Sequence, residues 1–266
     1  MRRVQSLPPF LDFPGPIAFA HRGGNEVAPE NTLEAFEAAV GLGYQYLETD
    51  VHLTRGGEIV AFHDKTLERV LGGDRTIADL SVAERKAAHM QQGARQYTIP
   101  LLDELLEHFP DTRFNIDAKS RDVVMPLLET LKRHDALDRV CVASFSNRNL
   151  RRMRRLVPGI CSTLSPSEVA QLWLTSKLPF ERVLGAKAPC VELPYKQRLR
   201  SGHRLTVATK ALIQKAHAHG MQVHVWTINN EAHMHHLLDL GVDGIMTDKP
   251  SVLKAVLVAR GQWIGV

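Results

Sequence analysis

Two acidic side chains in the segment YLETDV, residues 46–51, are spaced so that they can act together. Side chains alternate in direction along a strand, so Glu48 and Asp50 point to the same face. Two carboxylates this close repel each other and require a neutralising positive charge. A hard divalent cation with oxygen ligands would supply this charge. The alternative is that the two acids are simply exposed on the protein surface, as expected for a pattern of this kind that stands alone.

A histidine follows in the next segment, and a hairpin would bring it back to this acidic pair. Residues 55–58, RGGE, are typical of a two-residue hairpin loop with two glycines at its centre. If the residues that flank the glycines pair, His63 lies opposite Asp50. His63 then suits a role as general acid or base, with Asp64 as its orienting partner. His52 shares the face of the acidic pair, and we expect it to have a structural or loop role.

Two further strand-like segments end in groups that could act on an anionic substrate. His21 ends the apolar run IAFAH and Arg22, a bidentate donor suited to phosphate, follows it. Asp117 and Lys119 share a face of FNIDAK, residues 114–119, and offer a third carboxylate and a second cation. Two histidines beside a metal fit a reaction that needs one base for the nucleophile and one acid for the leaving group.

The elements that must position these residues alternate between strand and helix patterns along most of the chain. Eight helical patterns follow eight strand-like runs, which are residues 17–21, 46–51, 114–119, 139–146, 161–164, 191–195, 222–229 and 243–248. This alternation predicts an α/β fold, a (β/α)8 TIM barrel, whose catalytic groups lie at the carboxyl ends of the strands. The glycine-rich GxGxxG turn typical of a doubly wound dinucleotide-binding fold is missing.

The expected barrel contains one interruption of its regular pattern. Residues 65–100 form short, mixed segments after the second strand, which predicts an insertion in the second βα loop. We therefore expect one barrel domain over residues 14–266 that contains this insertion, preceded by an N-terminal extension over residues 1–13. Within the first loop, Asn31 or Thr32 is expected to cap the first helix. Gly23 and Gly24 are expected to let the backbone turn closely past a ligand.

Composition is that of an ordinary soluble globular protein, with 44% hydrophobic and 23% charged residues. The chain has no apolar run near the ~18 residues of a membrane-spanning helix, and its first residues lack the apolar core of a secretory signal. The three cysteines, Cys141, Cys161 and Cys190, form no CxxC pair. This spacing predicts neither a disulfide scaffold nor a cysteine zinc site, and favours a reducing cytoplasm.

The formal net charge is +4, and the basic excess is concentrated in RNLRRMRRL, residues 148–156. Such a run could contact a phosphate-rich partner such as nucleic acid. It could equally be the solvated face of a helix whose buried stripe is Leu150, Met153 and Leu156. The run has no interleaved aromatic residues, so we expect the helix face and no nucleic-acid partner.

Together, these motifs resemble the glycerophosphodiester phosphodiesterase family. The resemblance covers residues 17–250 in the order of the family's motifs, and the first block, at residues 21–32, is the most specific. It implies a TIM barrel with a small insertion after the second strand. The motifs are HRGG and PENT in residues 21–32, ETDV in 48–51, FHD in 62–64, NIDAK in 115–119, SF in 144–145, WTIN in 226–229 and DGIMTDKP in 243–250.

The resemblance also implies a role for each candidate site residue. His21 and His63 would be the general acid/base pair. The ligands of one divalent cation, Mg²⁺ or Ca²⁺, would be Glu48, Asp50 and Asp117. The phosphate would be held by Arg22 and Lys119, and Trp226 would line the glycerol side of the pocket.

One position departs from the family's pattern. The third acidic position is commonly glutamate in the family, and it is Asp117 here. The shorter side chain could change the coordination or the metal preference. Aspartate at this point also resembles the sphingomyelinase D-like phospholipases, which keeps a lipid substrate in consideration.

The expected activity is metal-dependent hydrolysis of glycerophosphodiesters, such as glycerophosphocholine or glycerophosphoethanolamine, to sn-glycerol 3-phosphate and an alcohol. One histidine would deprotonate the nucleophile, either water or the neighbouring glycerol hydroxyl, and the other would protonate the leaving alkoxide. The expected partner is this small-molecule substrate, with no stable membrane insertion; the alcohol, the metal and the oligomeric state are left open.

Two alternatives remain at this point. One is phospholipase D-type hydrolysis of a lysophospholipid or sphingolipid, which needs an apolar entrance along the insertion or around Trp173. The other is a non-catalytic barrel that binds phosphodiesters or anionic polymers through its basic surface.

Overall fold

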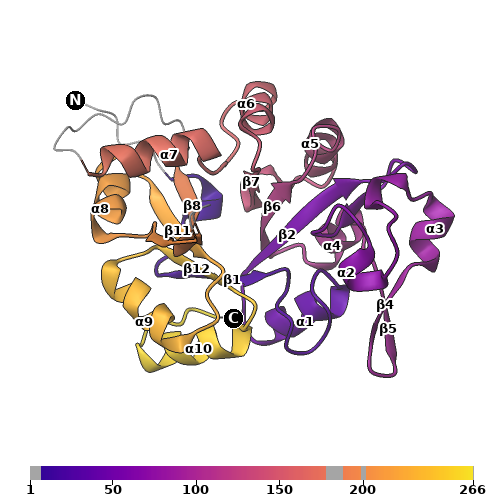
Figure 1. Cartoon of the computed structure of the whole chain (residues 1–266), viewed down its shortest axis with the longest axis horizontal. Coiled ribbons are helices and arrows are strands. Elements are labelled where there is room, and N and C mark those ends of the chain that lie inside the picture. Colours follow the sequence, from indigo (N-terminus) through magenta and orange to yellow (C-terminus); the bar gives the residue numbers. More distant parts are fainter. Residues whose placement is uncertain (1–6, 178–187, 199–201, 266) are drawn as a thin grey trace.

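The parallel sheet at the centre of the protein is curled into a barrel (Figure 1). The computed structural model describes residues 7–177, 188–198 and 202–265. Within these residues, seven strands pair in the order β7-β6-β2-β1-β12-β11-β8. They are β1 (Ile17–His21), β2 (Tyr46–Leu53), β6 (Arg113–Ala118), β7 (Val140–Ala143), β8 (Cys190–Pro194), β11 (Gln222–Trp226) and β12 (Gly244–Thr247).

The segment predicted as a strand over residues 161–164 takes the remaining position in the barrel. Ser162 pairs with Val142 of β7, and Thr163 pairs with Cys190 of β8, each as an isolated parallel bridge. These two bridges join the edge strands β7 and β8 and complete the ring. The predicted (β/α)8 TIM barrel is therefore confirmed, with a weak fifth strand.

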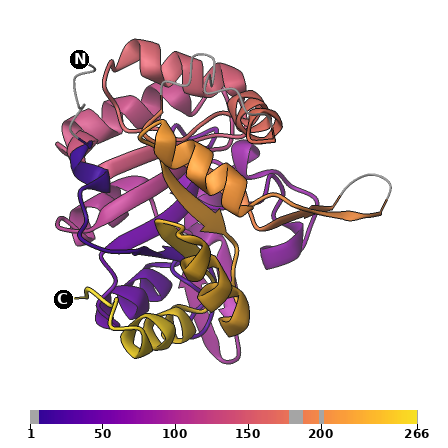
Figure 2. The ribbon, with the colours of Figure 1, turned by 90° about the vertical axis from the view of Figure 1, so that its left-hand side faces the viewer.

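Eight helices lie outside the strands, one after each barrel position (Figures 1 and 2). Within the part of the chain that the structure describes, no helix combines the length and the apolar character needed to cross a membrane. The helices are α1 (Leu33–Gly41), α4 (Leu102–His108), α5 (Val124–Arg133), α6 (Asn147–Leu156), α7 (Pro166–Thr175), α8 (Lys210–Ala218), α9 (Glu231–Leu240) and α10 (Pro250–Ala259).

The basic run on α6 packs as a helix face. Leu150 and Met153 are fully buried as predicted, whereas Leu156 is 38% exposed, so its predicted burial is wrong. Arg154 forms an ion pair with Glu168 of α7, with Nη1 2.9 Å from Oε1. This part of the basic excess therefore holds two neighbouring helices together.

Aromatic side chains fill the amino-terminal end of the barrel. Phe19 and Tyr46 point inward from β1 and β2 and contact Phe10 of the short 3-10 helix η1 (Pro9–Leu11). The hydroxyl of Tyr46 donates a hydrogen bond to the carbonyl of Phe10 (2.7 Å). Residues 9–11, within the predicted extension, therefore close this end of the barrel, while residues 1–6 lie outside the described part.

Residues 65–100 carry their own small elements and apolar cluster. Ile77, Met90 and Tyr97 are buried together with Phe62, separately from the main core. The segment lies at the right of Figure 1, beside β3 (Ile59–Ala61). Its elements are α2 (Glu68–Leu71), η2 (Ile77–Asp79), α3 (Val82–Ala87), β4 (His89–Gln92) and β5 (Arg95–Thr98).

A second excursion follows β8. Strands β9 (Lys196–Arg198) and β10 (Arg204–Thr206) pair antiparallel and project from the barrel, at the right of Figure 2.

The hairpin between β2 and β3 differs from the prediction. Its loop has three residues, 55–57, because the amide of Thr54 donates to the carbonyl of Glu58 (2.9 Å). Gly57 has a positive φ of 81°, the left-handed conformation in which a three-residue loop commonly closes. The predicted two-residue loop is therefore wrong, since Gly57 lets the turn accommodate one more residue.

The longer loop shifts the pairing register by one residue. His52 pairs with Val60, and the amide of Phe62 donates to the carbonyl of Asp50 (2.9 Å). Phe62, and not His63, therefore lies opposite Asp50. A one-residue shift reverses the face of a strand side chain. His63 still reaches the acidic pair because β3 has ended at Ala61 and the chain has left the strand conformation there.

Candidate active site

A cavity of about 300 Å³ opens at the carboxyl ends of the barrel strands. It lies where a TIM barrel normally places its active site. All eight site residues predicted from the sequence line it: His21, Arg22, Glu48, Asp50, His63, Asp117, Lys119 and Trp226.

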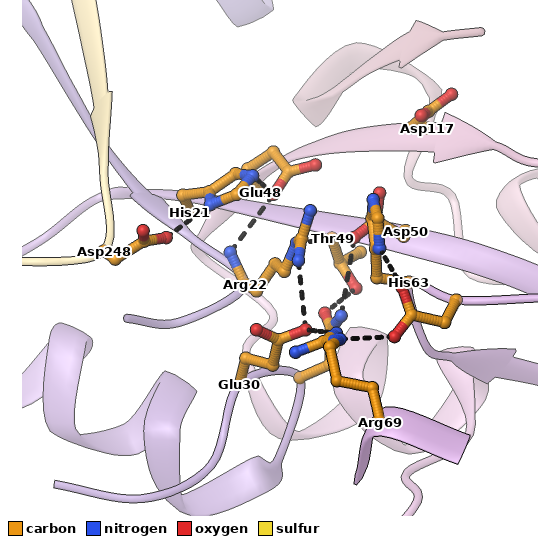
Figure 3. A network of polar contacts seen from close by, with 12 residues as sticks. His21, Arg22, Glu30, Glu48, Thr49, Asp50, His63, Arg69, Asp117 and Asp248 are labelled. Atoms are coloured by element: carbon orange, nitrogen blue, oxygen red, sulfur yellow. Dashed lines mark hydrogen bonds and ion pairs between the residues drawn. The ribbon is translucent and has the colours of Figure 1, made fainter. Parts of the chain in front are cut away.

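His21 ends β1 and is oriented by an aspartate from the far end of the chain. Its Nδ1 lies 2.6 Å from Oδ1 of Asp248, and its Nε2 lies 3.8 Å from Oε2 of Glu48 (Figure 3). Asp248 is held in turn by the side-chain amide of Asn229, at 2.7 Å. Burial opposes the charged form of His21, but Glu48 and Asp248 outweigh it and raise the pKa.

His63 follows β3 and has its own aspartate. Its Nδ1 lies 2.6 Å from Oδ1 of Asp64, the next residue, whose Oδ2 accepts a hydrogen bond from Arg69 Nε (2.5 Å). His52 Nε2 lies 3.2 Å from the carbonyl oxygen of His63, so its contact is with the backbone that carries His63. Both candidate catalytic histidines therefore have Nδ1 engaged by an aspartate.

Two of the predicted carboxylates lie side by side on β2. Glu48 is buried and accepts a hydrogen bond from the amide of Arg22 (3.1 Å). Burial, together with the negative charge of Asp50, raises its pKa to about 8. Asp50 contacts Arg22 Nε at 3.0 Å and Lys119 Nζ at 2.5 Å. Burial would raise the pKa of Asp50, but the cations Lys119 and Arg22 lower it.

Asp117 lies on the neighbouring strand, β6, and is only partly satisfied. Its Oδ2 accepts from Lys119 Nζ at 2.7 Å, while its Oδ1 is buried without a hydrogen-bond partner. Burial raises the pKa of Asp117 despite the Lys119 charge. The ammonium group thus lies between Asp50 and Asp117. The three carboxylates do not form a group whose oxygens all lie within 4.8 Å of one another: Glu48, Asp50 and Asp117.

The donor set nevertheless fits a hard divalent cation. Three carboxylates are buried at one cavity, one of their oxygens has no partner, and carboxylate oxygen is the ligand that Mg²⁺ and Ca²⁺ prefer. The ammonium group of Lys119 supplies the positive charge between Asp50 and Asp117.

A network of charges joins the first loop to the insertion (Figure 3). Arg22 Nη1 donates to Glu30 at 3.0 Å, and Arg69 of α2 donates to the same Glu30 oxygen at 2.5 Å. Since Arg69 also binds Asp64, one guanidinium joins the loop of Arg22 to the segment of His63.

The loop between β1 and α1 is fixed by tight packing. A Cβ at Gly23 would lie 2.8 Å from the backbone of Ala35 in α1, and one at Gly24 would lie 2.7 Å from the ring of Pro250. Both glycines have positive φ, 80° and 86°. They therefore let two helices pack closely against the loop. The predicted cap is confirmed, because Thr32 Oγ1 accepts from the amide of Ala35 at 3.2 Å.

Part of the cavity wall is apolar. Phe145 is 70% exposed and meets the ring of Trp226 edge to face, with centroids 5.9 Å apart. Leu164 and Val169 continue this wall. Of the described residues, neither Trp173 nor any residue of the insertion lines the cavity; its apolar wall comes from other segments.

A sequence model of the glycerophosphoryl diester phosphodiesterase family matches residues 21–252. The chain belongs to this family. It is 39% identical to a probable glycerophosphodiester phosphodiesterase 2 of Mycobacterium tuberculosis over 96% of both chains. It is 30% identical to a human lysophospholipase D, over 90% of this chain and 85% of that protein.

Solved structures agree with the fold. An Oleispira antarctica phosphodiesterase in complex with the product sn-glycerol-3-phosphate has a TM-score of 0.75 and 26% identity, and the match covers 92% of this chain and 97% of that one. A putative glycerophosphoryl diester phosphodiesterase from Silicibacter pomeroyi has a TM-score of 0.79 at 22% identity, with 97% and 100% covered.

Three polar residues of the site had no role assigned from sequence: Glu30, Arg69 and Asp248. Glu30 and Asp248 belong to the PENT and DGIMTDKP motifs. The motifs therefore indicated that these residues matter, but they did not indicate which residues they contact. Asp248 and His21 are 227 positions apart. Arg69 lies in the insertion, whose placement against the barrel no sequence pattern indicated.

Proposed function

We propose that this protein hydrolyses a glycerophosphodiester to sn-glycerol 3-phosphate and an alcohol, with His21 and His63 as the general acid/base pair. The observation that carries the proposal is the arrangement of these two histidines. Each is fixed at Nδ1 by an aspartate, and both line one cavity beside buried carboxylates. Two such groups can serve a base step and an acid step at a single phosphorus.

In this proposal, Glu48, Asp50 and Asp117 would hold one divalent cation, Mg²⁺ or Ca²⁺. When bound, such a cation neutralises charge that develops on the phosphoryl oxygens. Arg22 donates to the phosphate and is kept charged, because Asp50 and Glu30 outweigh burial and raise its pKa. Lys119, which lines the same cavity, supplies the second contact to the phosphate.

The two histidines exchange protons with the reacting oxygens through Nε2. One removes a proton from water or from the neighbouring glycerol hydroxyl, and the other donates one to the oxygen of the departing alcohol. Asp248 and Asp64 hold the imidazoles in position and stabilise the protonated form of each. Trp226 lines the side of the cavity that takes the glycerol moiety. The free cysteines suit a reducing compartment, so we place the protein in the cytoplasm.

The direct test is release of sn-glycerol 3-phosphate from glycerophosphocholine and glycerophosphoethanolamine with added Mg²⁺ or Ca²⁺, and with EDTA. We expect release that depends on the cation and falls by about 100-fold or more in His21→Ala and His63→Ala. A folded protein that releases no product from either substrate with either cation would refute the proposal.

A second candidate is phospholipase D-type cleavage of a lysophospholipid, favoured by the apolar wall of Phe145, Leu164 and Val169. The human relative named a lysophospholipase D is consistent with it. Rates on lysophosphatidylcholine and on glycerophosphocholine distinguish the two. A faster rate on the lysolipid that Val169→Asp abolishes, while the glycerophosphocholine rate persists, would select the second.

A non-catalytic phosphodiester-binding barrel makes the opposite prediction. In that case His21→Ala would leave every measurable function unchanged, and binding of glycerophosphocholine would proceed without turnover.

A further inference from the structure

The three cysteines of the chain come together in the barrel interior. Their sulfur atoms all lie within 4.8 Å of one another, and those of Cys141 and Cys190 are 3.8 Å apart. Cys141 and Cys190 are fully buried and Cys161 is 3% exposed. The three cysteines lie on three successive positions of the barrel: β7, the segment with the isolated bridges, and β8. They are far apart in the sequence.

The cluster forms the layer directly beneath the catalytic cavity. Ala143, Thr163 and Glu192 line the cavity, and each lies two residues after one of the cysteines on the same segment. Residues i and i+2 of a strand face the same side, so each sulfur lies below a residue of the cavity floor. On its other side, the cluster packs against Phe10 and Leu11, which close the barrel.

We propose that Cys141, Cys161 and Cys190 form a binding site for one thiophilic metal ion, Cu(I), held by three thiolates. Three sulfurs around an ion at a metal–sulfur distance of about 2.3 Å lie about 4 Å apart in a planar arrangement. The observed spacing of the sulfurs therefore needs little adjustment. This site is separate from the carboxylates of the active site and would be occupied independently of them.

The ligand number selects Cu(I) over zinc. Structural zinc sites are almost always four-coordinate, and no fourth His, Cys, Asp or Glu within the described ranges joins the three sulfurs. Soft thiolate ligands favour Cu(I), which is stable with three ligands in a site that excludes water. Thiolates are the binding form, so up to three protons leave the sulfurs for solvent when the ion binds.

A histidine lies on the strand next to that of Cys190. His224 lies on β11 beside β8; burial opposes its charged form, but Glu192 and Cys190 raise its pKa. In its protonated form, this imidazole would offset part of the negative charge of three thiolates around a monovalent ion.

The test is reconstitution with Cu(I) itself. The chain has no other cysteine, so any copper–thiolate signal comes from this cluster. The full chain is refolded anaerobically with Cu(I), because the buried sulfurs are closed to direct soaking. We expect one copper per chain after gel filtration, three sulfur neighbours by X-ray absorption, and an ultraviolet thiolate-to-copper charge-transfer band.

Three variants separate the cluster from the active site. Cys161→Ala should lose the charge-transfer band and lower copper affinity by at least tenfold, and Cys161→Ser provides a second variant in case the first does not fold. Glu48→Gln, which alters the carboxylate site only, should keep copper binding. Folding of each variant is checked by circular dichroism.

Three results would overturn the proposal. They are a refolded wild-type chain without stoichiometric copper, copper binding that survives both Cys161 variants, and a Cys141–Cys190 disulfide detected by mass spectrometry in place of the metal. Thermal unfolding is an independent readout, since an ion bound only to the native state raises the midpoint.

Discussion

At the scale of single residues, the site depends on pairs that fix the orientation of reactive side chains. His21 and His63 each contact an aspartate through Nδ1, at 2.6 Å in both cases. Asp248 is fixed further by Asn229, while Asp64 is fixed by Arg69. Neither aspartate is among the residues that line the cavity, so we expect their contribution to be to hold the imidazoles and stabilise their charged forms.

Replacement of Asp248 tests this positioning role. In Asp248→Asn, the neutral amide no longer stabilises protonated His21, and we expect kcat to fall about 100-fold or more with little change in KM. Steady-state hydrolysis of glycerophosphocholine measures both constants. Asp239→Asn is the control, because Asp239 is an exposed partner of Arg260 away from the cavity. Equal losses in the two variants would contradict the assignment.

At the scale of elements, the site is assembled from loops that helices and the insertion hold in place. The first loop begins at β1, ends at the cap of α1, and is joined to α2 through Glu30 and Arg69. Loops carry catalytic groups well only when rigid elements fix both of their ends. Changes to these joints should therefore affect activity more than stability.

Arg69 connects Glu30 with Asp64, and it can be replaced without changing a residue that lines the cavity. Arg69→Ala releases Asp64 and Glu30, so we expect a severalfold loss of kcat/KM. We expect less than about 1 kcal/mol of stability to be lost, since an exposed ion pair contributes little. Arg75→Ala is the matched control: Arg75 is similarly exposed, at 49% against 51%, and pairs with Glu84 within the same insertion. If both variants lost the same activity, the joint would have no special role.

The cap of α1 gives a second element-scale prediction. Thr32→Ala and Thr209→Ala each remove a side-chain acceptor at a helix start, α1 and α8 respectively, and each should cost about 1 kcal/mol in unfolding free energy. Only Thr32 adjoins Asn31, whose side chain contacts Thr49 and Asp50. Urea unfolding should thus show similar losses, while the activity assay should show a loss in Thr32→Ala alone.

At the scale of the whole molecule, charged pairs join different elements of the fold. Arg154 of α6 contacts Glu168 of α7, and Glu168 also accepts from the amide of its cap residue, Ser165, at 2.7 Å. Burial would raise the pKa of Glu168, but hydrogen bonds from Arg154 and Ser165 outweigh it and lower the pKa. Asp64 and Asp248 have lowered pKa values for the same kind of reason.

These carboxylates predict a loss of stability in acid. A group whose pKa is lower in the folded than in the unfolded state stabilises the fold above its unfolded pKa, which is about 4 for these acids. That stability is lost as pH falls through the folded pKa. We expect the unfolding free energy from urea titration to decline from pH 5 to about pH 3. Glu168→Gln should flatten the decline; an unchanged slope would show that Glu168 contributes nothing to it.

Much of the fold and the site follows from local patterns in the sequence. The alternation of strand and helix periods predicted a TIM barrel. Helices such as α1 and α10 lie at the predicted places. The positions of Glu48 and Asp50 on a period-two strand placed them at the carboxyl ends of the strands. Thr32 was identifiable as a cap because capping depends on residues three positions apart.

Tertiary structure decided the contacts between segments that are far apart in the chain. Gly57 added one residue to the hairpin loop, so His63 is placed by the end of β3 and not by strand pairing. Asp248 meets His21 because β12 closes the barrel beside β1. The cysteines lacked a local metal-binding spacing, yet successive strands brought them into one layer. Local geometry is set by neighbouring residues and can be predicted from them, whereas layers and ion pairs depend on how the closed barrel aligns its strands.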